Sequence, residues 1–511
     1  MELTRRFFIG GAAAFGALGG ARVRPLRAGE APAKKPNLTF GVVSDIHITH
    51  VGVGEKPERW GNNLTFRHTL EWFRDQGVDA VMVVGDMADH GMVEQLQAVA
   101  EAWYAVFPDD KAPDGRKVEK LFVYGNHDYH GYLYGDHAAK RHAKEAKESE
   151  FGAWSRDHVL RSDLAGWWKK IFHEDYTRLY RKVIKGYTFL GQHWDDGKGM
   201  ETKYGSCPFG VELKGFLDAH GKALDPKRPF FYFQHPHPKD TCYGPWAWGH
   251  DAGLVTKVLS AYPNAVAFSG HSHYSLTDER SIWQGAFTSV GTSSLRYTGL
   301  PYDQRPPFGY ENTTTESKAA AACNALKVMG DFPAGDCRQG MLWNVYDDCI
   351  VVQRREFLGD VFLGPDWVMP LAASEPRPFD FAARAKKAKA PEFPKGAQVT
   401  LKKRKAKTRR TPGYDAVEKD AWELTFPAAF AVPGSRPYEY EVVAHGAGGK
   451  TEAFHVMANG YNHAPGHPRA KGASSCCVSA DRLPPGTTHF TVTPLDCWWN
   501  KGAALTVKMP V

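Results

Sequence analysis

The sequence lacks several features that would assign it to a common class. No stretch reaches the roughly 20 apolar residues that a helix needs to cross a bilayer, so an integral membrane protein is not expected. Cysteine is scarce, with eight residues in 511, and the cysteines show no C-x-x-C repeat of the kind that holds structural zinc. The net charge of +7 is small for this length, so we expect no specific nucleic-acid binding.

Two enzyme classes with recognisable motifs find no support either. No G-x-S-x-G segment is present, which argues against a serine hydrolase built around a strand-to-helix nucleophile turn. Gly449-Lys450-Thr451 matches the end of a phosphate-binding P-loop, but Ala444 stands where the motif requires its first glycine. A P-loop nucleotidase is therefore excluded as well.

The N-terminus has the pattern of an export signal. Arg5 and Arg6 precede a Gly- and Ala-rich apolar run that ends near Ala21, and the arginine pair is typical of the twin-arginine route. At about 15 residues the run is too short for a membrane anchor, and no cysteine follows that could receive a lipid. We expect residues 1–33 to be a cleaved signal with a short leader, the twin-arginine translocation machinery to be a transient partner, and the mature protein to be periplasmic or secreted.

The cysteines are compatible with an oxidising destination. Cys323 and Cys337 fall in one loop-like region and could pair, and Cys476 or Cys477 could pair with Cys497 near the C-terminus. The sequence alone does not choose among these pairings.

Short apolar runs recur along the first half of the chain, and polar residues follow each of them. Runs of this length that are rich in Val, Phe and Tyr are typical of buried strands in an α/β sheet. Amphipathic segments at Leu64–Gln76 and Met92–Val106 indicate crossover helices between them. The predicted strands are Leu38–Ser44, Asp79–Val84, Lys120–Tyr124, Pro229–Phe233 and Ala265–Ser269.

These elements predict a first domain of the α/β class over residues 36–373. Insertions interrupt it near 129–185, which is rich in aromatic and basic residues, and near 294–338, which is loop-like. The strand-like segment Met341–Val352 would complete the domain.

A change of composition follows the first domain. Residues 374–410 are rich in Pro, Ala and Lys, and Arg384–Arg410 holds twelve basic residues against one acidic residue, Glu392. We interpret the stretch as a solvated linker with an exposed edge strand, and weak contact with an anionic surface is the alternative.

Residues 411–511 are predicted to form a small β-sandwich. Strand-like segments at Tyr438–Ala444, Ala453–Ala458 and Thr488–Pro494 are separated by turns rich in Gly and Pro. The stretch that begins at Thr488 and ends at Gly502 resembles the last strands of fibronectin type III-like modules.

Side chains that can bind metal ions follow each of the five predicted strands. Because the ends of neighbouring strands meet at one edge of a sheet, such residues can converge although they span more than 220 positions. The five segments are Asp45-Ile46-His47, Gly85-Asp86, Gly125-Asn126-His127-Asp128, Gln234-His235-Pro236 and Gly270-His271-Ser272-His273.

The mixture of imidazoles and carboxylates indicates which metals fit. It suits Zn, Mn or Fe better than Mg or Ca, which prefer oxygen ligands alone. Two such ions about 3.5–4 Å apart can clamp the attacking and leaving oxygens of an in-line displacement and activate a bound water. The lone Asp86 after a strand-ending glycine is a natural bridge between two ions.

The ordered set D-x-H, G-D, G-N-H-D, a strand-ending His and G-H-x-H resembles the calcineurin-like metallophosphoesterase superfamily, over residues 38 to about 275. The resemblance implies a two-sheet α/β/β/α sandwich with two divalent or trivalent metal ions (Mn, Fe or Zn) at the strand ends. Asp86 would bridge the ions, His127 would lie beside the leaving group, and Asp128 would orient His127. One ion would be held by Asp45, His47 and His273. The other would be held by Asn126, His235 and His271.

One departure narrows the resemblance. Purple acid phosphatases carry a Tyr shortly after the second motif, where this chain reads Met87-Ala88-Asp89-His90, so a tyrosinate-bound ferric ion is not expected. We interpret Asp89, His90 and His237 as ordinary loop residues. Arg296 and Tyr297 follow the fifth motif and could reach a phosphate, although this role is not the favoured one.

These observations predict an exported metal-dependent phosphoesterase, in which a hydroxide that bridges the metals attacks phosphorus in line. The expected substrate is a small-molecule, lipid or sugar phosphate ester. The sequence does not decide between a monoester and a diester. The alternative is a surface-binding or adhesion protein whose metal-binding domain is catalytically idle. The substrate, the metal pair, the oligomeric state and the role of the C-terminal module are not decided by the sequence.

Overall fold

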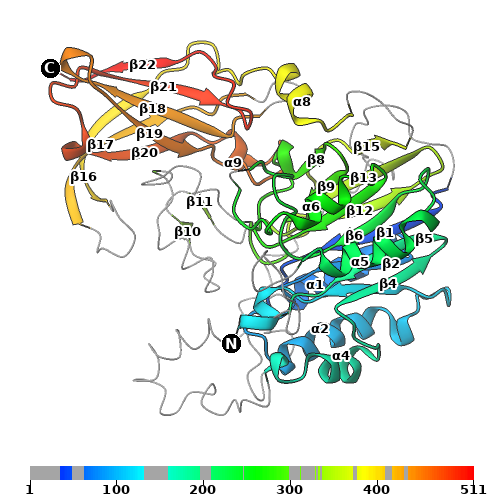
Figure 1. Ribbon diagram of the computed structural model, residues 1–511. Coiled ribbons are helices and arrows are strands. Elements are labelled where there is room, and N and C mark those ends of the chain that lie inside the picture. The colour runs from blue at the N-terminus through cyan, green and yellow to red at the C-terminus, as the bar shows by residue number, and fades with distance from the viewer. Residues whose placement is uncertain are drawn as a thin grey trace, which may run out of the picture.

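The structure is a computed structural model that describes most of the chain (Figure 1). The described residues are 35–48, 63–131, 159–195, 209–245, 247–298, 311, 328–329, 332–333, 337–371, 377–408, 417–430 and 436–510. The predicted signal at 1–33, parts of both predicted insertions and Cys323 lie outside these ranges.

The first sheet carries the first three motifs at the ends of parallel strands. β1 (Leu38–Val43) pairs in parallel with β2 (Ala80–Val84), and β2 pairs in parallel with β3 (Glu119–Val123). The strand order is β14-β13-β12-β1-β2-β3, with β15 also paired to β13. The antiparallel half consists of β12 (Gln339–Val345), β13 (Cys349–Glu356), β14 (Val361–Phe362) and β15 (Trp367–Pro370).

The second sheet carries the fourth and fifth motifs. β6 (Phe230–Phe233) and β7 (Ala265–Ser269) are parallel neighbours at its centre, in the order β4-β5-β6-β7-β9-β8. The other strands are β4 (Leu179–Ile184), β5 (Tyr187–Gln192), β8 (Ile282–Gln284) and β9 (Thr288–Gly291).

The two sheets pack face to face between two layers of helices, which confirms the predicted α/β/β/α sandwich (Figure 1). Side chains alternate along β1: Phe40 and Val42 lie in the core between the sheets, and Val43 lies in the core under the helices. Helices α1 (Asn63–Asp75), α2 (Val93–Val106) and α4 (Leu164–Phe172) cover the first sheet. Helices α5 (Val211–His220) and α6 (Leu254–Leu259) cover the second.

The C-terminal residues form two further antiparallel sheets around a separate core (Figure 1, yellow to red). The three-stranded sheet consists of β16 (Thr400–Thr408), β17 (Val417–Phe426) and β20 (Ser474–Ser479). The four-stranded sheet consists of β19 (Thr451–Met457), β18 (Glu439–His445), β21 (His489–Leu495) and β22 (Leu505–Lys508). Short elements elsewhere are α8 (Phe381–Lys387), α9 (Pro468–Lys471), β10 (Val328–Met329) and β11 (Phe332–Pro333).

The structure differs from two expectations and fills in a third. Met341–Val352 is not one strand but parts of β12 and β13, because a turn begins at Tyr346, whose N–H donates to the carbonyl of Cys349. Cys497 is a free thiol, so it is not paired with Cys476 or Cys477. The stretch interpreted as a linker holds α8 and β16, and β16 is the edge strand of its sheet.

The C-terminal module contacts the α/β domain through a loop that follows β19. The backbone carbonyls of Tyr461 and Asn462 accept hydrogen bonds from Thr277 Oγ1 (2.6 Å) and Gln339 Nε2 (2.7 Å). Both donors are buried, so these bonds lie in the interior of the contact. The module is thus bonded directly to the segment that follows the fifth motif.

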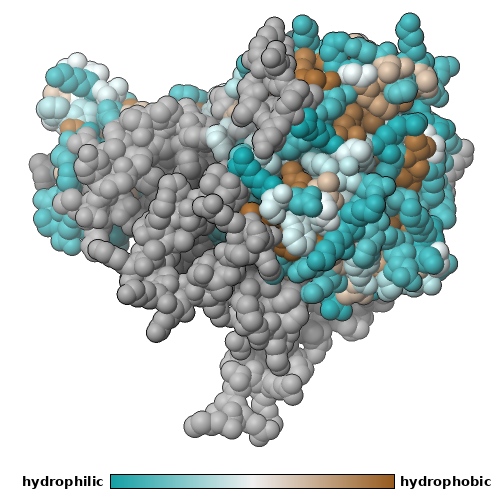
Figure 2. Space-filling model, turned by 60° about the horizontal axis from the view of Figure 1, so that its bottom comes forward, coloured by the Kyte–Doolittle hydropathy of each residue, from teal (hydrophilic) through white to brown (hydrophobic). Residues whose placement is uncertain are grey.

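A membrane span requires a helix of sufficient length and apolar composition. Within the ranges above, no helix has both the length and the apolar composition to span a bilayer. The coloured residues on the face shown in Figure 2 are mostly hydrophilic, with separate apolar patches among them, as is ordinary for a folded domain.

Candidate metal centre

The five motifs meet at one edge of the sandwich, directly after the strands that carry them. Five of the seven predicted metal-binding residues have positive φ angles, a backbone conformation that side-chain-bearing residues rarely adopt. Backbone strain of this kind concentrates at functional sites. The residues and their φ angles are Asp45 (51°), His47 (48°), Asp86 (53°), His271 (71°) and His273 (58°).

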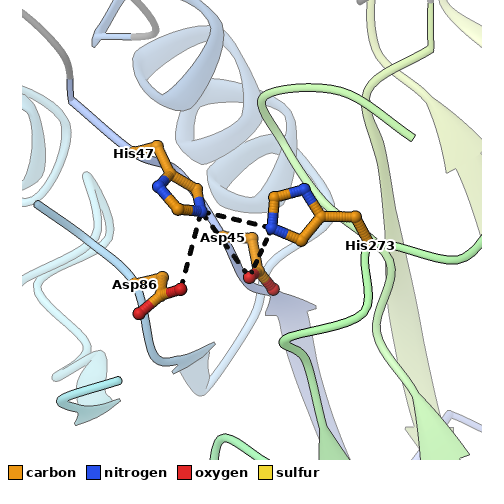
Figure 3. Close-up of side chains that lie close together, drawn as sticks. All are labelled: Asp45, His47, Asp86 and His273. Carbon is orange, nitrogen blue, oxygen red and sulfur yellow. Dashed lines mark hydrogen bonds and ion pairs between the residues drawn. The ribbon is translucent and has the colours of Figure 1, made fainter. Parts of the chain in front are cut away.

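The first cluster consists of Asp45, His47, Asp86 and His273 (Figure 3). His273 Nε2 lies 2.9 Å from Asp45 Oδ1 and 3.2 Å from His47 Nε2. His47 Nε2 also lies 3.6 Å from Asp86 Oδ2. The four side chains therefore present their ligand atoms to one point, at the separations that ligands of one small cation adopt.

The second cluster shares Asp86 with the first and adds His235 and His271. His235 Nε2 lies 3.0 Å from Asp86 Oδ2 and 3.8 Å from Asp45 Oδ1. The predicted ligand Asn126 is buried beside them, since the backbone N–H of the next residue donates to Asp86 Oδ1 at 2.8 Å. The structure thus brings together all seven predicted metal-binding residues, with Asp86 between the two groups.

The buried nitrogen and oxygen atoms of the site are arranged as ligands of a metal ion rather than as hydrogen-bond partners of one another. His235 Nε2 is fully buried and makes no hydrogen bond, although Asp86 Oδ2 is only 3.0 Å away. The opposite nitrogen of the same ring, Nδ1, lies 2.7 Å from the Val84 carbonyl and donates its proton there, so in the neutral ring Nε2 carries the lone pair. A buried nitrogen lone pair that faces carboxylate oxygens is the arrangement of a metal ligand held by its outer hydrogen bond.

The cluster is also electrostatically suited to cations. Burial raises the pKa of the Asp45 carboxyl, but the facing rings of His273 and His235 outweigh this effect and hold the pKa well below its usual range. Burial likewise disfavours a charged His47, yet its hydrogen bonds to Asp45 and Asp89 raise its pKa to about 9. The site therefore stabilises positive charge within the protein interior.

Three motif glycines make room for the metal-binding side chains. A Cβ on Gly85 would clash with the His235 ring, and one on Gly125 would clash with the Asp86 carboxylate. Gly270 lies in the same way against the Asp45 carboxylate. The glycines of G-D, G-N-H-D and G-H-x-H are thus required by close packing against a ligand of the site.

Replacing Gly125 with Ala is therefore expected to displace Asp86, to reduce the bound metal below two ions per chain and to lower phosphoesterase turnover about a hundredfold. The matched control is Gly215→Ala, because Gly215 lies on the exposed side of α5 with open space around its Cα. That variant should keep both ions and gain about 0.5 kcal/mol of stability. Metal content by elemental analysis and turnover of the same samples check both expectations, and normal metal content in the Gly125 variant would contradict the close-packing argument.

His127 lies beside the first cluster, and the group that orients it is not the predicted Asp128. Its ring lies 4.5 Å from the ring of His47, and its Nδ1–H donates to the backbone carbonyl of Asp89 at 2.8 Å. The Asp128 carboxylate, predicted to hold His127, instead accepts backbone N–H groups from the two turns beside it. Its donors are Met87 (3.2 Å), Ala88 (2.7 Å) and Gly125 (2.8 Å). Asp128 therefore fixes the turns that carry the second and third motifs to one another.

Asp89 is the site residue that sequence reasoning missed. It is buried, one oxygen lies 2.9 Å from His47 Nδ1, and Arg296 forms an ion pair with the same carboxylate. Arg296 is buried in this pair. Asp89 stands near the position where purple acid phosphatases carry Tyr, and here it orients a predicted metal ligand through that ligand's outer nitrogen. His237 is not an ordinary loop residue either, because each of its ring nitrogens is hydrogen-bonded to a serine hydroxyl. The two distances, to Ser269 Oγ and Ser272 Oγ, are both 2.7 Å.

A buried histidine near the site gives the fold a measurable acid sensitivity. His193 follows β5, accepts a hydrogen bond from the Tyr124 N–H and lies 4.6 Å from the ring of Trp168. Burial lowers its pKa from 6.5 to about 3, so the unfolded chain takes up a proton that the folded chain does not. Its contribution to stability is complete above pH 6.5 and is lost as the pH falls from 6.5 towards 3.

We therefore expect the stability lost between pH 7 and pH 5 to be smaller by about 2 kcal/mol in a His193→Gln variant than in the wild type. Glutamine keeps an acceptor for the Tyr124 N–H but does not titrate. Urea unfolding at the two pH values measures the difference. An equal loss in both proteins would mean that other groups determine the acid sensitivity.

Comparison with known proteins agrees with this geometry. Residues 38–275 match the family model for calcineurin-like phosphoesterases. A dimetal phosphatase from Danio rerio is 14% identical, over 66% of this chain and 100% of its own, with a TM-score of 0.37. A purple acid phosphatase from yellow lupin (Lupinus luteus) seeds is 12% identical, over 66% of this chain and 56% of its own, with a TM-score of 0.38. None of the curated proteins matches the chain.

The family match spans all five motifs, from the first residue of β1 to the residues just after His273. It agrees with the fold, with the two clusters and with the shared carboxylate of Asp86. Residues 38–275 therefore form a calcineurin-like phosphoesterase domain, and this match supports a metal-dependent phosphoesterase.

Proposed function

We propose that the protein hydrolyses a phosphate monoester or diester outside the cytoplasm, with two metal ions held by the two clusters that share Asp86. The observation that carries the proposal is this sharing, because one carboxylate oxygen of Asp86 faces His47 in one cluster and His235 in the other. When bound, a pair of such ions activates water and neutralises charge on the phosphoryl oxygens.

The residues of the chain divide the remaining tasks. Asp45, His47 and His273 would hold one ion, and the second would be held by Asn126, His235 and His271. In the reaction a water oxygen joins phosphorus, the ester P–O bond breaks, and the alcohol leaves with a proton.

His127 is suited to move that proton. It is a quarter exposed, whereas Asp45, His47, Asp86, His235 and His273 are buried. Its Nδ1–H is held by the Asp89 carbonyl, so Nε2 carries the lone pair of the neutral ring. At this atom it can exchange a proton with the attacking water or with the leaving oxygen.

Two further parts of the proposal rest on the sequence. The arginine pair at Arg5-Arg6 supports export through the twin-arginine route, with release into the periplasm or the medium. The C-terminal pair of sheets supports a fibronectin type III-like module. The basic strand β16 is compatible with weak contact to an anionic surface, although Arg404 and Lys405 are paired with Glu423 and Asp420.

The test is turnover of p-nitrophenyl phosphate and bis-p-nitrophenyl phosphate by the chelated protein after addition of Mn, Zn or Fe. Cleavage that returns with metal supports the proposal, and the ratio of the two rates separates a monoesterase from a diesterase. A folded sample that binds two ions and cleaves neither compound would favour the alternative, a surface-binding protein with an idle metal domain.

A further inference from the structure

An exposed tryptophan lies directly on one of the metal-binding residues. The Trp248 ring stacks on the imidazole of His271, with ring centroids 4.4 Å apart and planes inclined by 25°. Its side chain is nevertheless 52% exposed, so the stacking covers one face and leaves the other to solvent. An exposed indole loses the hydrophobic stabilisation of burial, and at the mouth of a candidate active site such a ring indicates a ligand contact.

The segment that carries Trp248 is held firmly rather than hanging from the surface. The His237 N–H donates to the Gly249 carbonyl at 2.8 Å, and the Asp251 N–H donates to the His237 carbonyl at 2.7 Å. Gly249 has a φ of 90°, and a Cβ there would lie 2.9 Å from His271 Cδ2. This glycine therefore allows the backbone to lie against the same histidine that the tryptophan covers.

The surroundings of the two clusters are aromatic. The Trp194 ring lies 5.8 Å from His271, and the Tyr297 ring lies 4.4 Å from His273 at the other cluster. Arg296, which precedes Tyr297, is buried in its ion pair with Asp89 and so is not presented to a second phosphate group. The described walls of the site suit an apolar organic group rather than a chain of further phosphates.

We propose that Trp248 forms a wall of the substrate site and that the natural ester carries a flat apolar group, such as an aromatic ring, that stacks on the exposed indole face. The inference rests on the proposed phosphoesterase function and specifies its substrate class. Stacking of two aromatic rings contributes about 1 kcal/mol beyond the burial of their area, which is enough to select one ester over another.

The experiment compares wild type with Trp248→Ala and Trp248→Phe, all loaded with metal. KM and kcat are measured for phenyl phosphate and n-propyl phosphate by phosphate release. Binding of phenylphosphonate and n-propylphosphonate, which lack the scissile P–O ester bond, is measured by calorimetry. Phe430→Ala is the control, because Phe430 is an exposed aromatic residue of the C-terminal module.

Trp248→Ala is expected to raise KM for the phenyl ester and Kd for phenylphosphonate about fivefold, with little effect on the propyl compounds. Trp248→Phe should restore most of the difference. Equal losses for phenyl and propyl compounds, or fewer bound ions, would overturn the inference and make Trp248 a shield for His271. If wild type cleaves neither ester, the monoesterase form of the proposed function fails, whereas the phosphonate preference still decides the role of Trp248.

Discussion

Replacing Asp86 with Asn should lower phosphate-ester turnover by at least about a thousandfold and reduce the bound metal below two ions per chain. Asp86 Oδ1 accepts the His127 N–H at 2.8 Å, a bond that an asparagine oxygen can keep. The other oxygen, Oδ2, faces His235 and His47, and there an amide NH₂ would replace the shared ligand. The substitution therefore changes the metal-facing atom and leaves the backbone contact in place.

The matched control lies at the other end of the same strand. Asp79 precedes β2, is buried, and accepts the Thr39 N–H at 2.9 Å, so Asp79→Asn makes the same chemical change away from the metal centre. It should keep two ions and turnover within about twofold of wild type, with at most a modest loss of stability. Wild-type turnover by Asp86→Asn with both ions bound would rule out the shared-carboxylate mechanism.

Much of the fold and the placement of the candidate metal ligands at the strand ends could be predicted because each signal is local. The strands are short runs buried on both faces, as in the five-residue β2, and such runs are visible without knowledge of their neighbours. The ligands come directly after those strands in fixed motifs, so strand order alone brings them together. The motif glycines have a physical reason, because a Cβ on Gly125 would clash with the Asp86 carboxylate.

The parts that the sequence did not reveal depend on contacts between distant segments. Asp89 follows the second motif, but nothing in the sequence connects it with Arg296, which lies 207 positions away. The group that orients His127 is a backbone carbonyl. Every residue type carries one, so the sequence does not indicate this contact. Trp248 is one of 15 tryptophans, and only the stacking on His271 distinguishes it.

The role of the C-terminal module is also not visible in the sequence, and a substitution of Gln339 can test it. Gln339 is fully buried at the start of β12, and its Nε2 donates to the Asn462 carbonyl of the module. Its Oε1 accepts from the Leu276 N–H at 2.8 Å and from Ser293 Oγ at 3.1 Å. One side chain thus joins the module to the segment after His273 and to the loop after β9.

That loop in turn supports the first motif. The Ser293 carbonyl accepts a hydrogen bond from Ser44 Oγ at 2.9 Å, and Ser294 Oγ donates to the Asp45 carbonyl at 3.0 Å. A change at Gln339 should therefore reach two metal-binding residues, Asp45 and His273, without contacting either. Outer hydrogen bonds of this kind alter metal affinity about ten- to a hundredfold when they are removed.

Replacing Gln339 with Leu is accordingly expected to lower the free energy of unfolding by about 3 kcal/mol, because the Leu276 N–H and the Asn462 carbonyl lose their partner in the interior. Metal affinity should fall about tenfold in the same variant.

The control is Gln284→Leu. This buried glutamine bonds the Phe379 N–H and Thr288 Oγ1, and neither of these residues is a candidate ligand of the metal centre. Urea unfolding and Mn²⁺ titration of both variants separate two roles for the module. Similar destabilisation with weakened metal binding in Gln339→Leu alone would mean that the C-terminal module positions the metal centre. Unchanged metal affinity in both variants would limit the module to stabilising the fold.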